Sequence, residues 1–297
     1  AQVSYVKGCN VIGEDIDEIN RAVKVAKTSD VAIVVLGENE WQKANKSGTS
    51  GEGYDVATLE LTGRQQELIR RVNETGTRTV VVLINGRPLA IPWIDENVPA
   101  IVEAWIPGEK GGAAIAGILF GDFNPSGKLT VTIPRHAGQL PVYYNHKPSK
   151  RYWLKEGWGN SYADLDHRPL YPFGYGLSYA QFEYSKLEIS PEQSGPFGTF
   201  RIRAEITNTS DVPGSEIVQL YIRDKISSVV RPVKELKGFE RISLEPGESK
   251  LVHFELGYDQ LKMLNRDLNW TVEPGEFTMM VGSSSEDIRL TGSLRID

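Results

Sequence analysis

One long segment of the chain combines carboxylates with aromatic rings. It runs over residues 37–61, and its acidic and aromatic members include Glu38, Glu40, Trp41, Glu52, Tyr54 and Asp55. This combination is typical of carbohydrate sites, because rings stack on sugar faces while carboxylates bind hydroxyl groups or transfer protons. The alternative is that these residues are solvated charges of a surface loop, and residue types alone do not decide between the two interpretations.

Glu52 has the most unusual surroundings of these residues, because it lies between Gly51 and Gly53 in the stretch SGEGYD. Glycine permits backbone conformations that other residues avoid and offers no side chain for packing. A carboxylate between two such residues is either an exposed charge or a group that a loop delivers to a site.

Other kinds of catalytic site find little support. The four histidines show no metal-ligand spacing, so we expect no metal; they are His136, His146, His167 and His253. The stretch GYGLSYA does not form a G-x-S-x-G nucleophile elbow. The glycine-rich GEKGGAAIAG lacks the order of glycines in a dinucleotide fold and the Lys-Ser/Thr ending of a P-loop. We therefore expect no cofactor.

Composition narrows the class of protein further. A chain of 297 residues favours two domains, and its net charge of −6 argues against binding to nucleic acid or to an anionic membrane. The single cysteine, Cys9, excludes an internal disulfide and a cysteine-based metal site. No apolar run reaches membrane-spanning length. We favour a periplasmic or secreted location over a cytoplasmic one.

The first part of the chain, residues 1–136, predicts an α/β domain with a mainly parallel sheet. Helix-like and strand-like patterns alternate there, as expected of βαβ units. We expect one helix at 15–28, a second that begins after a Thr62 cap and ends at Gly76, and a third that begins at Gly111. We expect one strand at 31–36 and two more that begin at Thr79 and at Pro99. The 37–61 segment then leaves the carboxyl end of the first strand, where open α/β sheets bind ligands, and it is far longer than an ordinary connection.

The second part predicts a different architecture. Residues 137–179 are rich in Pro, Gly and aromatics and predict a connecting strap, in which we expect Tyr143, Tyr144, Tyr171, Phe173 and Tyr175 to be largely buried. Residues 180–297 contain short alternating segments separated by turn signals, which predict an antiparallel β-sandwich of immunoglobulin or fibronectin type III kind. We expect no helix after Ser185.

Three runs of sequence resemble the C-terminal part of glycoside hydrolase family 3, which includes bacterial β-glucosidases and β-xylosidases. They are SGEGYDVATLELTGRQQELI, the run from VLINGRPLAIPW to GDFNPSGKLTVTIPR, and RPLYPFGYGLSYAQFEYS. The resemblance implies a six-stranded α/β-sandwich domain followed by a fibronectin type III-like domain. One departure is Val56, where relatives often carry arginine after the aspartate, so a local ion pair is expected to be missing beside Asp55.

The resemblance also implies a function for the SGEG glutamate, because Glu52 matches the family's acid/base position. The nucleophilic aspartate would belong to an N-terminal barrel that these 297 residues do not contain. The chain is then expected to be part of a retaining, exo-acting β-glycosidase, with no turnover without a barrel-bearing chain or domain. Its substrates would be β-linked gluco- or xylo-oligosaccharides or aryl glycosides, and a β-glucosidase is the favoured form. The chain would be a separate subunit or a cleavage product.

Two alternatives remain, a β-xylosidase of the same family and a non-catalytic carbohydrate-binding or scaffold module. The sequence leaves homo-oligomer formation open. Trp41 is expected to line the aglycone side of the pocket, because an indole ring stacks well on a sugar face; the alternative is that Trp41 anchors its loop.

Overall fold

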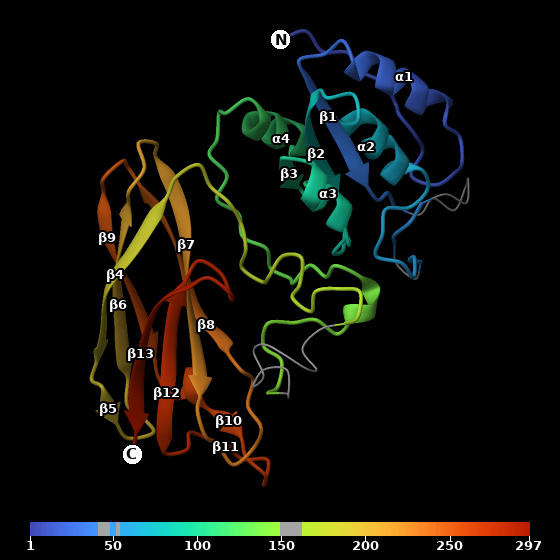
Figure 1. The fold of residues 1–297 in the computed structure, drawn as a ribbon. Coiled ribbons are helices and arrows are strands. Elements are labelled where there is room, and N and C mark those ends of the chain that lie inside the picture. The colour runs from blue at the N-terminus through green and yellow to red at the C-terminus, as the bar shows by residue number, and fades with distance from the viewer. Residues whose placement is uncertain (41–47, 52–53, 149–161) are drawn as a thin grey trace. The chain divides into compact units, whose positions relative to one another are not determined.

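The computed structural model describes residues 1–40, 48–51, 54–148 and 162–297, which divide into two compact units (Figure 1). Unit 1 comprises Ala1–Phe120 and Ile133–Leu140, and unit 2 comprises Gly121–Thr132 and Pro141–Asp297. The predicted fold class is confirmed, because unit 1 contains a parallel sheet with helices and unit 2 an antiparallel β-sandwich. The predicted boundaries, 1–136, 137–179 and 180–297, stay predictions.

The sheet of unit 1 is parallel, with the strand order β1-β2-β3. The strands are β1 (Val31–Gly37), β2 (Arg78–Ile84) and β3 (Ala100–Glu103). Their short β-branched runs are typical of buried parallel strands. The resemblance implied six strands, whereas the described residues of unit 1 form three. Because all three strands run the same way, their carboxyl ends meet at one edge of the sheet.

Two amphipathic helices cover one face of this sheet. Helices α1 (Asp17–Ala26) and α2 (Gln65–Asn73) pack on each other, and α2 packs on β1 and β2. The residues buried between these layers are Ile19, Leu68, Ile69 and Val72 from the helices and Val34, Leu36, Val81 and Leu83 from the strands. The predicted Thr62 cap is wrong, because the Thr62 hydroxyl donates to the Val11 carbonyl and α2 begins only after Arg64.

Two further helices follow β2 and β3. Helix α4 (Gly111–Leu119) was predicted from its small residues, whereas α3 (Pro92–Asn97) was not anticipated. Proline suits the first turn of a helix, where its missing N–H would have no partner. On the second face of β1, Val31, Ile33 and Val35 are exposed among the described residues.

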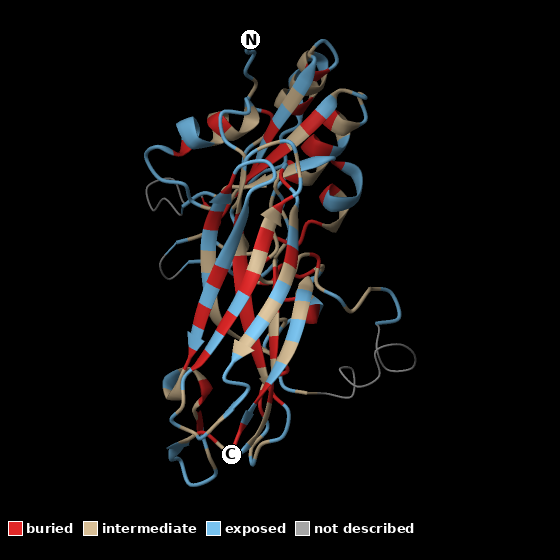
Figure 2. Ribbon diagram, turned by 90° about the vertical axis from the view of Figure 1, so that its left-hand side faces the viewer, coloured by how far each residue is buried: buried red, intermediate tan, exposed pale blue. Residues whose placement is uncertain are grey.

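Unit 2 is a sandwich of two antiparallel layers, in which β5 alone joins its neighbour in parallel. One sheet has the order β5-β13-β12-β7-β8, and the other has the order β4-β6-β9. Buried and exposed residues alternate along the strands (Figure 2), so each sheet turns one apolar face inward. The bounds are β4 (Phe182–Ser190), β5 (Gln193–Ser194), β6 (Phe200–Asn208), β7 (Gly214–Asp224), β8 (Glu235–Leu244), β9 (Ser249–Leu256), β12 (Gly275–Gly282) and β13 (Ile288–Ile296).

Short elements complete the two units. Strands β10 (Met263–Leu264) and β11 (Trp270–Thr271) form a separate pair in unit 2, and η1 (Ala137–Gln139) is a 3-10 turn in unit 1. One helical turn, α6 (Tyr258–Leu261), lies after Ser185, where we expected no helix. The turn buries Leu261 in the core of the sandwich, which accounts for a helix that strand alternation did not reveal.

The aromatic residues of the predicted strap differ in burial. Tyr144 stacks on Phe173 with ring centroids 4.4 Å apart, and Tyr171 stacks on Tyr175 at 5.2 Å. These four side chains are only half-buried. Tyr143 is 54% exposed, so the prediction is wrong for this residue. Its neighbour Tyr144 occupies the position in contact with Phe173 and Tyr221.

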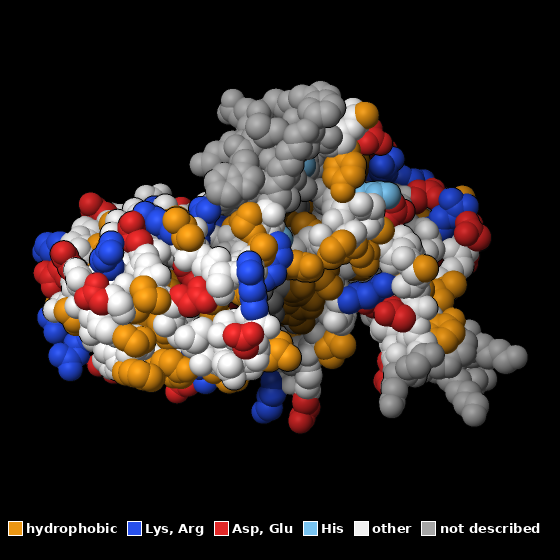
Figure 3. Space-filling view, turned by 90° about the horizontal axis from the view of Figure 1, so that it is seen from below, with side chains coloured by type: hydrophobic (Ala, Val, Ile, Leu, Met, Phe, Trp, Pro, Cys, Tyr) orange, Lys and Arg blue, Asp and Glu red, His pale blue; other side chains and the backbone are white. Residues whose placement is uncertain are grey.

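The surface carries charges of both signs. Acidic and basic side chains are interspersed over the face in Figure 3, which fits the modest net charge of −6. Among the residues that the structure describes, no helix combines the length and apolar character needed to span a membrane.

Candidate active site

The 37–61 segment leaves β1 at a glycine whose conformation is required. Gly37 has φ +136, and a side chain there would collide with the carbonyl oxygen of Ile84 on β2. The buried amide of Gln65 on α2 accepts a hydrogen bond from the Gly37 N–H at 2.7 Å and donates to its carbonyl oxygen at 2.9 Å. The direction in which the segment begins is therefore fixed from both sides of the strand.

The segment then returns to its own start. The N–H groups of Thr49 and Ser50 donate to the carbonyl oxygen of Asn39 at 3.0 and 3.2 Å, and Glu40 forms a parallel bridge with Ser50. Thr49 is fully buried. Residues 48–51 are thus held against the first residues after β1.

The residues on either side of positions 52 and 53 also lie close together. The N–H of Tyr54 donates to the carbonyl oxygen of Gly51 at 3.1 Å. Gly51 and Tyr54 are therefore held to each other by a backbone hydrogen bond.

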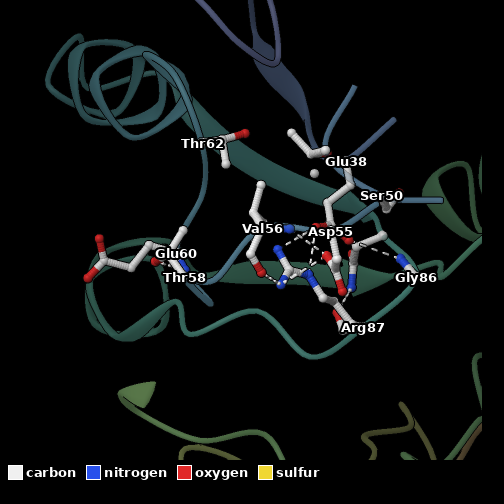
Figure 4. Close-up of polar contacts among 12 residues, drawn as sticks. Glu38, Ser50, Asp55, Val56, Thr58, Glu60, Thr62, Gly86 and Arg87 are labelled. Atoms are coloured by element: carbon white, nitrogen blue, oxygen red, sulfur yellow. Dashed lines mark hydrogen bonds and ion pairs between the residues drawn. The ribbon is translucent and has the colours of Figure 1, made fainter. Parts of the chain in front are cut away.

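Arg87 joins two parts of the segment to the end of β2 (Figure 4). Its Nε donates to Glu38 Oε1 at 2.8 Å, and its Nη1 donates to the carbonyl oxygen of Val56 at 2.8 Å. The same Nη1 lies 3.3 Å from the Asp55 carboxylate. The N–H of Gly86 donates to the other oxygen of Glu38 at 3.3 Å. We call these five residues the Arg87 cluster.

The members of the Arg87 cluster differ in burial. The side chain of Glu38 is 4% exposed and that of Arg87 is 17% exposed, whereas that of Asp55 is 61% exposed. Glu38 and Arg87 are thus a largely buried ion pair, in which each charge depends on the other because water is excluded. Asp55 adds a weaker, solvent-screened contact.

A second carboxylate lies at the end of β3. The side-chain amide of Asn85 donates to the Arg87 carbonyl oxygen at 2.8 Å and lies 3.4 Å from Glu103 Oε2. The Trp105 N–H donates to Glu103 Oε1 at 3.0 Å. Burial raises the pKa of Glu103 to about 7, although these two hydrogen bonds act in the opposite direction. The ends of all three strands are therefore linked by polar contacts.

The sequence-predicted site residues have different outcomes. Glu52 and Trp41 lie outside the described residues. Glu38 and Asp55 are brought together by Arg87. Val56 cannot pair with Asp55, whose carboxylate lies 3.3 Å from Arg87 instead.

Sequence reasoning missed two residues of the site, Arg87 and Gln65. The motif NGRP directly follows the second strand. The shared carboxyl edge of parallel strands could therefore have identified Arg87.

Two family models match the chain. The glycosyl hydrolase family 3 C-terminal domain model covers residues 1–179, which is more than half of the chain. The chain belongs to glycosyl hydrolase family 3. A fibronectin type III-like domain model matches residues 216–285 of unit 2. The resemblance found in the sequence is thereby confirmed.

The family relatives are longer than this chain. A β-xylosidase from Formosa agariphila is 45% identical over 96% of this chain and 38% of its own length. A periplasmic β-glucosidase from Salmonella typhimurium is 37% identical over 97% of this chain and 40% of its own length. A solved β-glucosidase from Listeria innocua in complex with glucose matches with a TM-score of 0.86 at 34% identity, over 97% of this chain and 39% of its own. The chain thus spans about two-fifths of these relatives.

Proposed function

We propose that this chain is the part of a retaining, exo-acting β-glycosidase that supplies the acid/base carboxylate, Glu52. The nucleophilic aspartate belongs to a barrel-bearing domain or chain outside these 297 residues. The substrates are terminal non-reducing β-D-glycosyl residues of oligosaccharides or aryl glycosides, and glucose is the favoured sugar. Family membership and the glycosidase names of the relatives support this proposal.

The observation that carries the proposal is the anchoring of the chain on both sides of Glu52. Residues before it are bonded to the first residues after β1, and residues after it are bonded to Arg87 at the end of β2. The carboxyl edge of a parallel sheet is where α/β folds bind ligands.

The chemistry assigns Glu52 two roles in turn. A retaining glycosidase uses two carboxyl groups roughly 5–5.5 Å apart, one of which attacks the sugar while the other protonates the leaving oxygen. The second group then activates water to release the sugar. Glu52 is this second group. Glu38 is a poor substitute, because its side chain is buried and paired with Arg87.

A β-xylosidase is the second candidate. Two β-xylosidases from Formosa agariphila, one of them putative by name, are 45% and 41% identical to this chain. The β-glucosidase from Salmonella typhimurium is 37% identical to it. Most contacts to the terminal sugar come from the barrel-bearing part, so that part determines whether glucose or xylose is preferred. A periplasmic or secreted location is proposed by analogy with the periplasmic relative.

Trp41 is proposed to line the aglycone side of the pocket. Its replacement by alanine in the complete enzyme should raise KM for long substrates more than for short ones, because only long substrates reach a ring at that side. Equal effects on long and short substrates would assign Trp41 to anchoring the 37–61 segment.

Reconstitution tests the proposal as a whole. The chain alone and the chain joined to its barrel-bearing part should be assayed with aryl β-glucoside and aryl β-xyloside. We expect turnover only in the joined form, and the better substrate identifies the sugar. An inactive joined protein that still binds β-linked oligosaccharides would instead support a carbohydrate-binding module.

A further inference from the structure

We propose that Arg87 is a positioning residue that holds both ends of the Glu52-bearing segment at the carboxyl edge of the sheet. This inference rests on the proposed function, because the group that Arg87 positions is Glu52. Within the described residues, Arg87 contacts Glu38, Asp55 and Val56 of this segment.

The contacts of Arg87 lie on both sides of Glu52 in the sequence. Glu38 precedes Glu52, while Asp55 and Val56 follow it. A residue that binds only one side would leave the other free to move. Arg87 thereby ties residues 38, 55 and 56 of the segment to the chain that follows β2 (Figure 4).

The guanidinium group is suited to this task because it is planar and presents several donors in fixed directions. Nε donates to Glu38 Oε1 at 2.8 Å, and Nη2 lies 2.8 Å from the same oxygen without a hydrogen bond, while Nη1 donates to Val56 and lies 3.3 Å from Asp55. An ammonium group carries the same charge but cannot reproduce this fork. Arg87→Lys therefore keeps Glu38 paired and removes the link to Val56.

The backbone at Arg87 is itself held by contacts of the two preceding residues. The side-chain amide of Asn85 donates to the Arg87 carbonyl oxygen, and the Gly86 N–H donates to Glu38. Asn85 is 1% exposed. Because Asn85 is buried directly after β2, its hydrogen bond fixes the backbone of Arg87 at the end of this strand.

A matched control exists in unit 2. Arg231 is also buried and also bridges two carboxylates, Asp224 and Glu235. Arg231→Lys makes the same chemical change at a comparable ion-pair site with no link to the 37–61 segment in the described residues.

The test combines hydrogen exchange with kinetics in the complete enzyme. In Arg87→Lys, amides of residues 48–60 should exchange faster than in the wild type, while Arg231→Lys should leave them unchanged. The kcat/KM of Arg87→Lys should fall about 10–100-fold for aryl glycosides with poor leaving groups, because a displaced acid donates its proton badly. Substrates with good leaving groups should lose little.

The outcomes separate the inference from the proposed function. Unchanged exchange over residues 48–60 in Arg87→Lys would overturn the inference. Faster exchange without a leaving-group effect, while Glu52→Ala shows that effect strongly, would overturn positioning but leave the role of Glu52 intact. If neither Arg87→Lys nor Glu52→Ala changes the dependence of kcat/KM on leaving group, the proposed function fails. Faster exchange in Arg87→Lys would then still show that Arg87 holds residues 48–60 in place.

Discussion

The two units each contain a buried arginine that bridges two carboxylates, but the bridges join different things. In unit 2, Arg231 pairs with Glu235 at 2.5 Å and lies 3.9 Å from Asp224. These are the first residue of β8 and the last residue of β7, two strands that already pair with each other. In unit 1, Arg87 joins the end of β2 to a segment that, apart from Gly37 and one bridge, belongs to no strand in the described residues.

The carboxylates at the two arginines also differ in burial. Both carboxylates at Arg231 are shielded, with side chains 4% and 25% exposed. Burial raises the pKa of Asp224 despite the nearby Arg231 charge. Burial would also raise the pKa of Glu235, but Arg231 and Lys237 hold it below its usual value. At Arg87 one carboxylate is buried and the other, Asp55, is 61% exposed. The bridge at Arg231 is thus the more shielded of the two, whereas the Asp55 carboxylate at Arg87 is open to solvent.

The largest expected effect on stability is at Arg231. Arg231→Ala leaves Asp224 and Glu235 without their common partner, and breaking a buried pair in this way costs about 3–5 kcal/mol. Urea unfolding of the complete enzyme should show this loss. The dependence of kcat/KM on leaving group should stay as in the wild type. A changed dependence would erase the proposed distinction between the two arginines.

Gly37 sharpens the comparison at the start of the 37–61 segment. Gly37→Ala combines a positive φ with a clash against the Ile84 carbonyl oxygen, so we expect a loss of roughly 2–4 kcal/mol. Gly76→Ala is the control, because φ is +78 there and no atom lies within 4 Å of the added carbon. It should cost only about 1–2 kcal/mol. Equal losses by urea unfolding would mean that the clash at Gly37 is relieved by movement of β2.

Glu103 gives a smaller effect that depends on pH. Its pKa is about 7 in the folded protein against an ordinary 4.5. The folded state therefore binds the proton more tightly, and stability should fall as pH rises from about 4.5 to 7. The shift sets an upper limit of about 3 kcal/mol, reduced by the partial exposure of Glu103.

Glu103→Gln should make the unfolding free energy less dependent on pH across this interval. The test is urea unfolding of wild type and variant at several pH values. An identical pH dependence in the two proteins would show that the Glu103 carboxyl is not the titrating group.

Sequence patterns predicted most elements of the fold, because the periodicity of apolar residues directly reflects which face is buried. The β-branched runs at Val31 and Thr79 became β1 and β2. Local signals were less reliable where a tertiary contact competed. Thr62 looked like a helix cap, but its hydroxyl binds the Val11 carbonyl, far away in the sequence.

The candidate site was predictable only in part. The carboxylates of the 37–61 segment were recognisable by type, by position after a strand and by resemblance. Arg87 was not recognised, because its partners Glu38 and Asp55 lie far from it in the sequence and only pairing of β1 with β2 brings them together. Gln65 was missed for the same reason, since its amide binds the backbone of Gly37.

The most direct test of the central claim is azide rescue of Glu52→Ala in the complete enzyme. Loss of an acid/base group should slow substrates with poor leaving groups by about 10²–10⁴-fold and spare the first step for good ones. Release of the sugar also slows, because no group activates water. We expect azide to restore this step and to yield a β-glycosyl azide, since azide attacks the intermediate without a base. Near-normal rates on poor leaving groups, or no azide product, would contradict the assignment of Glu52.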